Sequence, residues 1–309
     1  MTLLWSIVLL LVGFVLLIKG ADWFVDGASG IAAKFGIPQI IIGLTIVAMG
    51  TSAPEAAISI TAAAKGSADI TIGNIVGSNI LNVWVILGLS ALFAPLLVAK
   101  KTLQREVPFT IAITVLLLLL GLDGAVQRWD GAILWVCFLA YLSYLFVQTR
   151  RNRADEPTVG RARKLWQLIA MTVVGIGCIV LGSNVTVDAA SEIARYFGWS
   201  ERLIGLTIVA FGTSLPELFT SVAAARKGNA GIAIGNIVGS NIFNILFVVG
   251  TSALVTPVPF AAAFRLDTCI AAAAVVTLLL FCLPRQRLSR PWGAVMLALY
   301  AGYFVWICL

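Results

Sequence analysis

The sequence has no histidine among its 309 residues, and only 11% of them are Asp, Glu, Lys or Arg. A soluble domain carries roughly 25% charged residues, so this chain has too few to cover a surface that faces water. Histidine is also the commonest proton shuttle and metal ligand. These two absences argue against a soluble protein and against chemistry that depends on imidazole.

Cysteine is scarce as well, and its five copies have no metal-ligand spacing. Each lies in an apolar stretch, where a free thiol behaves as a small packing residue. They are Cys137, Cys178, Cys269, Cys282 and Cys308. Without histidine, a metal cluster or a nucleophile paired with a base, the sequence does not favour a membrane enzyme. We therefore expect no catalytic residues and no cofactor.

Apolar runs are abundant instead, since 60% of the residues are hydrophobic. A helix needs about 20 apolar residues to cross the hydrocarbon core of a bilayer. We therefore predict an all-α membrane protein with ten transmembrane helices. The predicted spans are Leu3–Ile18, Ile37–Ala64, Ile70–Phe93, Val107–Leu122, Gly131–Val147, Trp166–Val187, Leu203–Ala225, Ile232–Leu254, Leu266–Leu283 and Trp292–Leu309.

The basic residues lie mainly between the predicted spans, and mainly on one side. If odd-numbered spans run inward, 16 Lys and Arg residues lie on the inner side and 5 on the outer side. This bias is the positive-inside signal, so the net charge of +7 reports topology rather than a nucleic-acid partner. It predicts a multi-pass protein of the cell inner (plasma) membrane with both termini outside the cytoplasm.

The two halves of the chain repeat each other at an offset of 162 residues. Residues 205–244 match residues 43–82 without a gap at 28 of 40 positions, and the most polar segment lies between the halves. We predict a first five-helix repeat at 1–147, a basic cytoplasmic linker at 148–165 and a second five-helix repeat at 166–309. Because five is odd, the second repeat enters the membrane from the opposite side. Inverted repeats of this kind place their binding site near the midplane, on broken helices.

A Gly-Thr-Ser-Ala-Pro-Glu sequence, from Gly50 to Glu55, interrupts the second predicted span. Pro54 has no N–H to donate and its ring clashes with the carbonyl of Gly50, so we expect the helix to bend or break and to free carbonyl oxygens. Exposed backbone is tolerated at this depth only inside protein or beside a water-filled cavity. The second repeat has the same residues at Gly212, Thr213, Ser214, Pro216 and Glu217. Two such breaks indicate an ion path lined by both repeats.

The two glutamates are the leading candidates for ion ligands. A carboxylate at mid-membrane costs about 3 kcal/mol or more on insertion scales, and Glu55 and Glu217 repeat that cost unless a cation offsets it. On the following span, Asn74, Ser78 and Asn82 are four residues apart and share one helix face. Their counterparts are Asn236, Ser240 and Asn244. The alternative interpretation is that these amides and hydroxyls only hold helices together.

The candidate ligands are all oxygen atoms, from carboxylates, hydroxyls, amides and free carbonyls. Oxygen-only coordination suits hard cations, and many flexible oxygen ligands favour calcium. Zinc or copper would need nitrogen or sulfur ligands. Two carboxylates also balance the charge of one divalent ion. The residues therefore predict a calcium-type site at the centre of the molecule.

At these residues the chain resembles the sodium/calcium exchangers of the cation/calcium antiporter superfamily, especially their bacterial and archaeal members. The motifs G-T-S-x-P-E and G-N-x-x-G-S-N each occur twice, and the resemblance covers the whole ten-span layout. It implies a calcium site at Thr51, Glu55, Thr213 and Glu217. It also implies sodium or accessory sites at Ala48, Ser52, Ser78, Asn82, Ala210, Ser214, Ser240 and Asn244, with backbone carbonyls supplied by the two alanines.

The resemblance implies a secondary active antiporter that exchanges calcium for sodium by alternating access. Asn244 stands where some family members have Asp, so proton-driven or potassium-dependent cation exchange stays open as an alternative. A channel is a third interpretation, and two unlike inverted halves argue against a symmetric pore. Asp26 and Asp188 either seal a gate or are solvated charges at helix ends. The expected partners are inorganic cations and the lipid bilayer, with no obligate protein partner, so we expect a monomer.

Overall fold

The computed structural model describes residues 3–66, 68–151, 163–198 and 210–308, and most of them are helical. Within these ranges seven helices are long and apolar enough to cross a membrane, or eight if one bent pair counts as a single span. The chain is therefore an all-helical protein of the membrane type. The start of the predicted span Leu203–Ala225 and most of the predicted linker lie outside the described residues.

The elements of the first half are α1 (Leu3–Phe35), α2 (Gln39–Ile42), η1 (Gly43–Val47), α3 (Ala48–Thr51), α4 (Ala53–Ala64), α5 (Asp69–Leu81), η2 (Asn82–Leu87), α6 (Gly88–Phe93), β1 (Leu96–Leu97), α7 (Lys100–Gln104), α8 (Glu106–Leu120), β2 (Ala125–Val126) and α9 (Arg128–Arg151). Those of the second half are α10 (Leu165–Tyr196), α12 (Ala210–Gly212), α13 (Leu215–Arg226), α14 (Ala230–Phe243), η4 (Asn244–Val249), α15 (Gly250–Val255), β3 (Val258–Pro259), α16 (Ala262–Cys282), β4 (Arg287–Leu288) and α17 (Arg290–Cys308). The η elements are π-helical turns that continue an α-helix.

Two very short antiparallel ladders join the two halves. In one, Leu96 of β1 pairs with Leu288 of β4; in the other, Val126 of β2 pairs with Val258 of β3. The offset of 162 carries β1 onto β3, because 96 + 162 = 258, and β2 onto β4, because 125 + 162 = 287. The two ladders are therefore the same contact made twice, with the roles of the halves exchanged.

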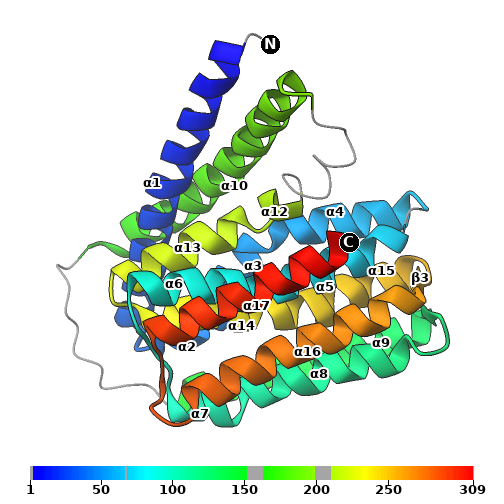
Figure 1. Cartoon of the computed structure of the whole chain (residues 1–309). Helices are drawn as coiled ribbons and strands as arrows, with labels where there is room; N and C mark the ends of the chain where they lie inside the picture. The colour runs from blue at the N-terminus through cyan, green and yellow to red at the C-terminus, as the bar shows by residue number, and fades with distance from the viewer. Residues whose placement is uncertain (1–2, 67, 152–162, 199–209, 309) are drawn as a thin grey trace.

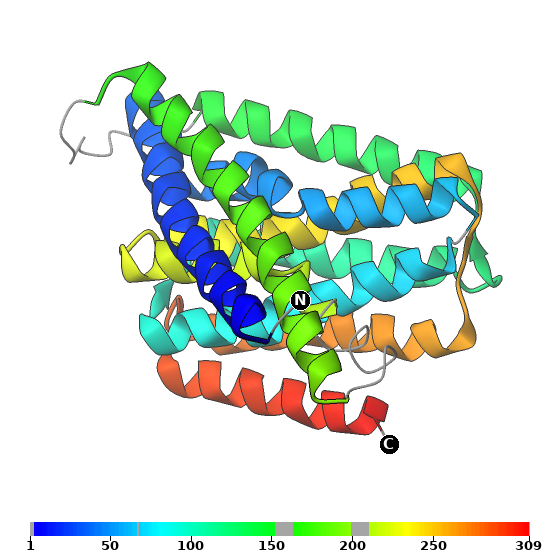
Figure 2. The same cartoon turned by 90° about the horizontal axis from the view of Figure 1, so that it is seen from above.

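Helices α1 and α10 lie side by side and cross the rest of the bundle at an angle (Figures 1 and 2). Their contact is close because it is lined by glycine. A Cβ on Gly20 would lie 2.9 Å from the carbonyl oxygen of Gly175, and a Cβ on Gly175 would lie 2.6 Å from the backbone nitrogen of Phe24. Small residues of this kind allow membrane helices to approach one another directly.

The predicted ends of the first and sixth spans, at Ile18 and Val187, were wrong. Helix α1 continues to Phe35 and α10 continues to Tyr196. The apolar run stops at Lys19, but the helix continues because its next turns bury Phe24 and other residues against its neighbours. The spans predicted around the runs α5 to α6 and α14 to α15 and around the helices α8, α9, α16 and α17 overlap them, with ends displaced by at most about four residues.

The centre of the molecule is formed by two long helical runs, α5 to α6 and α14 to α15. They are the most enclosed of the candidate spans, whereas α1, α9, α10 and α16 show most of their surface to the outside. Helix α14 packs against η1, α2 and α3. At this seam a Cβ on Gly235 would lie 2.9 Å from the Cα of Gly43. The broken helices are thereby held against the most buried part of the fold.

Candidate functional site

The predicted break at the Gly-Thr-Ser-x-Pro-Glu turn is confirmed. Helix α3 ends at Thr51, Ser52 leaves the helical region with φ −82° and ψ 8°, and α4 begins at Ala53 with its axis bent by 51°. Pro54 lies in the first turn of α4, where its missing N–H is tolerated. Because Pro54 cannot donate, the carbonyl of Gly50 has no i+4 donor.

The second copy of the turn has the same geometry. Helix α12 ends at Gly212, Ser214 has φ −90° and ψ 4°, and α13 begins at Leu215 with Pro216 in its first turn. In both copies the glutamate therefore lies in the first turn of the helix that follows the break. Helix N-termini carry partial positive charge, which stabilises a carboxylate there.

Both glutamates are buried, and each is held by the turn of the other half. Glu55 is 1% exposed and Glu217 is 0% exposed. The hydroxyl of Ser52 donates to Oε1 of Glu217 at 2.7 Å, and the hydroxyl of Ser214 donates to Oε1 of Glu55 at 3.3 Å. This reciprocal pair of hydrogen bonds brings the two turns together at one place in the protein.

Serines of the two central helices complete this group. Ser240 on α14 donates to Oε1 of Glu217 at 3.5 Å, and the hydroxyls of Ser214 and Ser78 on α5 lie 3.5 Å apart. Ser78 and Ser240 are 5% and 0% exposed. The structure therefore brings together all four of the predicted serines with both glutamates.

The asparagines of α5 and α14 form a network across the halves. Asn82 donates its amide to Oδ1 of Asn241, and Asn244 donates to Oδ1 of Asn79, both at 3.1 Å. Asn79 and Asn241 in turn donate to each other's backbone carbonyls at 3.3 and 3.2 Å. The amide nitrogens of Asn82 and Asn244 thus donate within this network, whereas their side-chain oxygens take no part in it.

Four buried oxygens of the predicted site have no hydrogen-bond partner among the described residues: Oε2 of Glu55, Oε2 of Glu217, Oδ1 of Asn82 and Oδ1 of Asn244. Leaving a buried polar atom unpaired costs about 1–3 kcal/mol, and more for a charged group. All four atoms accept and none donates. Oxygen acceptors of this kind suit hard cations.

Thr51 and Asn236 connect the first break to α14. The hydroxyl of Thr51 donates to Oδ1 of Asn236 at 3.0 Å, and the amide of Asn236 donates to the backbone carbonyl of Glu217 at 3.3 Å. Asn236 also donates to Ser221 at 2.9 Å, and half-buried Asn74 makes the repeat-equivalent bond to Ser59 at 2.9 Å. Both asparagines thus join neighbouring helices, and the bonds of Asn236 to Thr51 and Glu217 connect it to the site as well.

The backbone carbonyl of Ala48 is engaged within its own turn. It accepts from the backbone nitrogen of Ser52 at 3.0 Å and from the hydroxyl of Thr51 at 3.3 Å. Its counterpart Ala210 is the first residue of α12, and Thr213 is buried just after that helix. In this conformation the carbonyl of Ala48 is therefore already engaged by two donors.

Asn79 and Asn241 are the residues that sequence reasoning missed. They follow Ser78 and Ser240 directly, so they fall off the face defined by the four-residue spacing. The signal was present in the repeat, since both are asparagine at an offset of 162. The π-turns that begin at Asn82 and Asn244 were also missed; such turns occur frequently at functional sites.

Asp26 and Asp188 occupy unlike surroundings although the repeat equates them. Nζ of Lys227 lies 2.7 Å from Oδ1 of Asp26 and 3.2 Å from Oδ1 of Asp22, which ties the turn after α13 to α1. Asp188 is exposed and has no ion-pair partner among the described residues. The solvated interpretation fits Asp188, whereas Asp26 belongs to an inter-helix contact.

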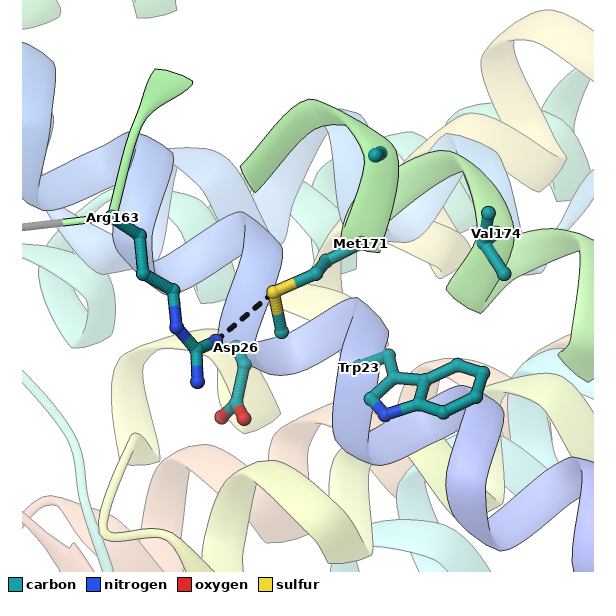
Figure 3. Close-up of a pocket in the computed structure, with 6 residues that line it drawn as sticks. Trp23, Asp26, Arg163, Met171 and Val174 are labelled. Carbon is teal, nitrogen blue, oxygen red and sulfur yellow. Dashed lines mark hydrogen bonds between the residues drawn. The ribbon is translucent and has the colours of Figure 1, made fainter. Parts of the chain in front are cut away.

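A surface pocket of about 400 Å³ beside Asp26 lies between α1 and the start of α10, and it contains none of the predicted ion ligands (Figure 3). Trp23, Met171 and Val174 supply its apolar lining. Arg163 donates to the sulfur of Met171 at 3.0 Å. Its composition offers no set of oxygen acceptors, so it is not a candidate for the ion site.

Comparison with known proteins agrees with this arrangement. A family model described as "Sodium/calcium exchanger protein" matches residues 5–147 and 167–309. Inner membrane protein YrbG of Escherichia coli (strain K12) is 38% identical, over 97% of this chain and 95% of its own length. Sodium/calcium exchanger MaX1 of Methanosarcina acetivorans is 32% identical over 97% of each chain. The solved structure of the sodium-calcium exchanger NCX_Mj, soaked with sodium and calcium, matches with a TM-score of 0.86 at 32% identity and covers 97% of each chain.

Proposed function

Because this chain belongs to the sodium/calcium exchanger family, we propose that it is a multi-pass membrane antiporter that exchanges calcium for sodium by alternating access. The observation that supports this proposal is a set of four buried oxygens, on Glu55, Glu217, Asn82 and Asn244, that have no hydrogen-bond partner among the described residues. They lie on elements from both halves and include two carboxylates. Cations are the ligands that such acceptors bind.

The proposed assignment of ligands follows the chemistry of each oxygen. Calcium binds between Glu55 and Glu217, with Thr51 and Thr213 beside them, because two carboxylates neutralise one divalent charge. Sodium ions use overlapping oxygens, so the two ions compete. The sodium ligands and accessory oxygens are those of Ser52, Ser78, Asn82, Ser214, Ser240 and Asn244, with the carbonyls of Ala48 and Ala210.

The proposed coupling rests on charge. An empty site would carry two carboxylates through the membrane, which is costly, whereas one calcium ion balances their charge of −2 and about three sodium ions leave a single positive charge. With three sodium ions moving against one calcium, one net positive charge crosses per cycle. A membrane potential of 100 mV then contributes about 2.3 kcal/mol. No cofactor and no protein partner are needed for this cycle, and a monomer suffices.

The proposed topology is ten spans arranged as two inverted repeats at 1–147 and 166–309, joined by a basic linker at 148–165. The exchanged pairing of β1 with β4 and of β2 with β3 supports it, as does the reciprocal bonding of Ser52 and Ser214. The positive-inside bias supports an inner-membrane location with both termini outside the cytoplasm.

Reconstituted protein tests the proposal. The purified chain in proteoliposomes loaded with sodium is expected to take up radioactive calcium when sodium is absent outside, and to lose that uptake when potassium or choline replaces the internal sodium. Uptake that follows a pH gradient without sodium would instead identify a proton-driven exchanger. Uptake that requires potassium together with sodium would identify the potassium-dependent alternative.

A further inference from the structure

A second group of buried acceptors lies at the end of the molecule that carries the linker. It lines a cavity of about 950 Å³ between α2, α7, the start of α8, the end of α9 and the start of α14, where Figure 1 places α2 and α7. Its polar lining includes Thr102, Glu106 and Gln148. We call this cavity the linker-side pocket.

Among the described residues that line the pocket Glu106 is the only acid, and it is 3% exposed. Its Oε1 accepts from the hydroxyl of Tyr144 at 3.2 Å, and that hydroxyl accepts from Arg105 at 3.4 Å. Its Oε2 is buried and has no donor among the described residues. One carboxylate oxygen is therefore fixed by α9, and the other lacks a partner within the protein.

Two neutral oxygens accompany this carboxylate. Oε1 of Gln148, at the end of α9, is also buried without a donor among the described residues, and the side chain of Thr102 on α7 is 2% exposed. Both residues line the same pocket as Glu106. A carboxylate, an amide oxygen and a hydroxyl make an oxygen-only set, which suits a hard cation.

We propose that the linker-side pocket binds one alkali metal cation, with Glu106 as the charged ligand and Gln148 and Thr102 as neutral oxygen ligands. A single carboxylate balances a single charge. Lys101 and Arg285 also line the pocket, and their charges disfavour a divalent ion more than a monovalent one. Sodium or potassium therefore fits better than calcium.

The linker-side pocket is separate from the central site in this conformation. Its lining includes none of the residues assigned to the central site, and the close contact of Gly43 with Gly235 packs η1 against α14 beside it. The carboxylate of this pocket is not repeated in the second half. The offset of 162 pairs Glu106 with Thr268. The inference therefore concerns a side-specific ion site and does not depend on the roles of Glu55 and Glu217.

Equilibrium binding of radioactive rubidium and sodium to the purified full chain tests the proposal. Saturating calcium is added so that the central site is filled. We expect one alkali ion per chain to remain bound, and Glu106→Gln to weaken this binding by at least about tenfold, which corresponds to 1.4 kcal/mol. The matched control is Asp267→Asn, since Asp267 likewise accepts from a tyrosine of a neighbouring helix, Tyr303 at 2.9 Å, but does not line the pocket.

No residual alkali ion in the wild-type chain, or full binding by Glu106→Gln, would overturn the proposal. If Glu106→Gln does not elute as a folded protein, Gln148→Leu decides, with several-fold weaker binding expected and unchanged binding contradicting the site. The Glu55→Gln, Glu217→Gln double variant separates this inference from the proposed function. It is expected to keep one bound alkali ion even though its calcium binding is lost.

Discussion

Each central carboxylate is anchored through one oxygen and left open through the other. Oε1 of Glu217 accepts from Ser52 and Ser240, and Oε1 of Glu55 accepts from Ser214, while both Oε2 atoms are buried without a partner among the described residues. Anchoring removes side-chain freedom before an ion binds, so less entropy is lost on binding. The serines therefore act as orienting groups as well as possible ligands for sodium.

Ser52→Ala tests the anchor at the residue scale. It removes a 2.7 Å hydrogen bond to a buried carboxylate, and bonds to charged groups contribute about 1.5–3 kcal/mol. We expect the apparent affinity for both ions to fall by about tenfold or more, measured from the ion dependence of calcium flux. Ser143→Ala is the control, because Ser143 is exposed and donates only to the carbonyl of Leu139 in its own helix. Equal affinities in the two variants would contradict the anchoring role.

For single residues, the sequence predicts the candidate ion ligands better than it predicts the residues that hydrogen-bond to them. Repetition and residue type single out Glu55, Glu217 and the four serines, and the structure places all six together. What the sequence leaves undetermined is orientation. The roles of Asn79 and Asn241 depend on which way an amide points in three dimensions, and no spacing rule contains that information.

Among the elements, α1 and α10 form a pair that crosses the rest of the bundle at an angle and is packed through glycine (Figure 2). Gly175→Val tests this contact, because its Cβ would lie 2.6 Å from the backbone of Phe24. Overpacking of this kind costs about 1–3 kcal/mol, so we expect a lower melting temperature. Gly177→Val is the matched control, since nothing lies within 4 Å of a Cβ there. Equal melting temperatures in Gly175→Val and Gly177→Val would mean that α1 and α10 can move apart without a loss of stability.

A second element-scale contact joins α1 to the turn after α13 through Lys227. The pair with Asp26 is partly exposed, with Lys227 27% and Asp26 40% exposed, so its contribution is at most about 1 kcal/mol. We expect Lys227→Ala to speed backbone hydrogen exchange in the last turns of α1 by up to about fivefold. Lys65→Ala is the control, because Lys65 is the repeat counterpart and is exposed. Identical exchange in both variants would contradict the role of this contact.

Hydropathy predicts which segments cross the membrane but not where their helices end. It stops α1 at Ile18, although the helix continues to Phe35. Charged residues such as Lys19 and Asp22 interrupt the apolar run, yet they lie on a helix whose other face is packed. The break at Pro54 was predictable because proline acts on the backbone directly, whereas the π-turn at Asn82 depends on packing against other helices.

For the whole molecule, the two halves share one plan but differ at their ends. The end of the molecule with the linker-side pocket also carries the contact of Lys227 with Asp26. The repeat counterparts of Glu106 and Asp22 are Thr268 and Asn184. The offset of 162 thus predicts the elements but not these differences. These contacts distinguish the two ends of the molecule from each other.

The proposed orientation is tested by reporters fused to the C-terminus. The excess of basic residues on one side predicts that both termini lie outside the cytoplasm. We therefore expect an alkaline phosphatase fusion, which is active only outside the cytoplasm, to be active, and a green fluorescent protein fusion to stay dark. A fusion placed after residue 155, within the predicted linker, is the control and is expected to give the reverse result. A bright C-terminal fluorescent fusion would contradict the topology.

The central claim is that Glu55 and Glu217 together hold the transported cation. The most direct measurement is sodium-driven uptake of radioactive calcium by Glu55→Gln and by Glu217→Gln in proteoliposomes, beside Asp188→Asn as an exposed acidic control. Each Gln variant keeps the shape of the side chain but removes the charge that balances calcium, so we expect uptake to fall to background in both while the control transports normally. Uptake near the wild-type rate in either Gln variant would contradict the account.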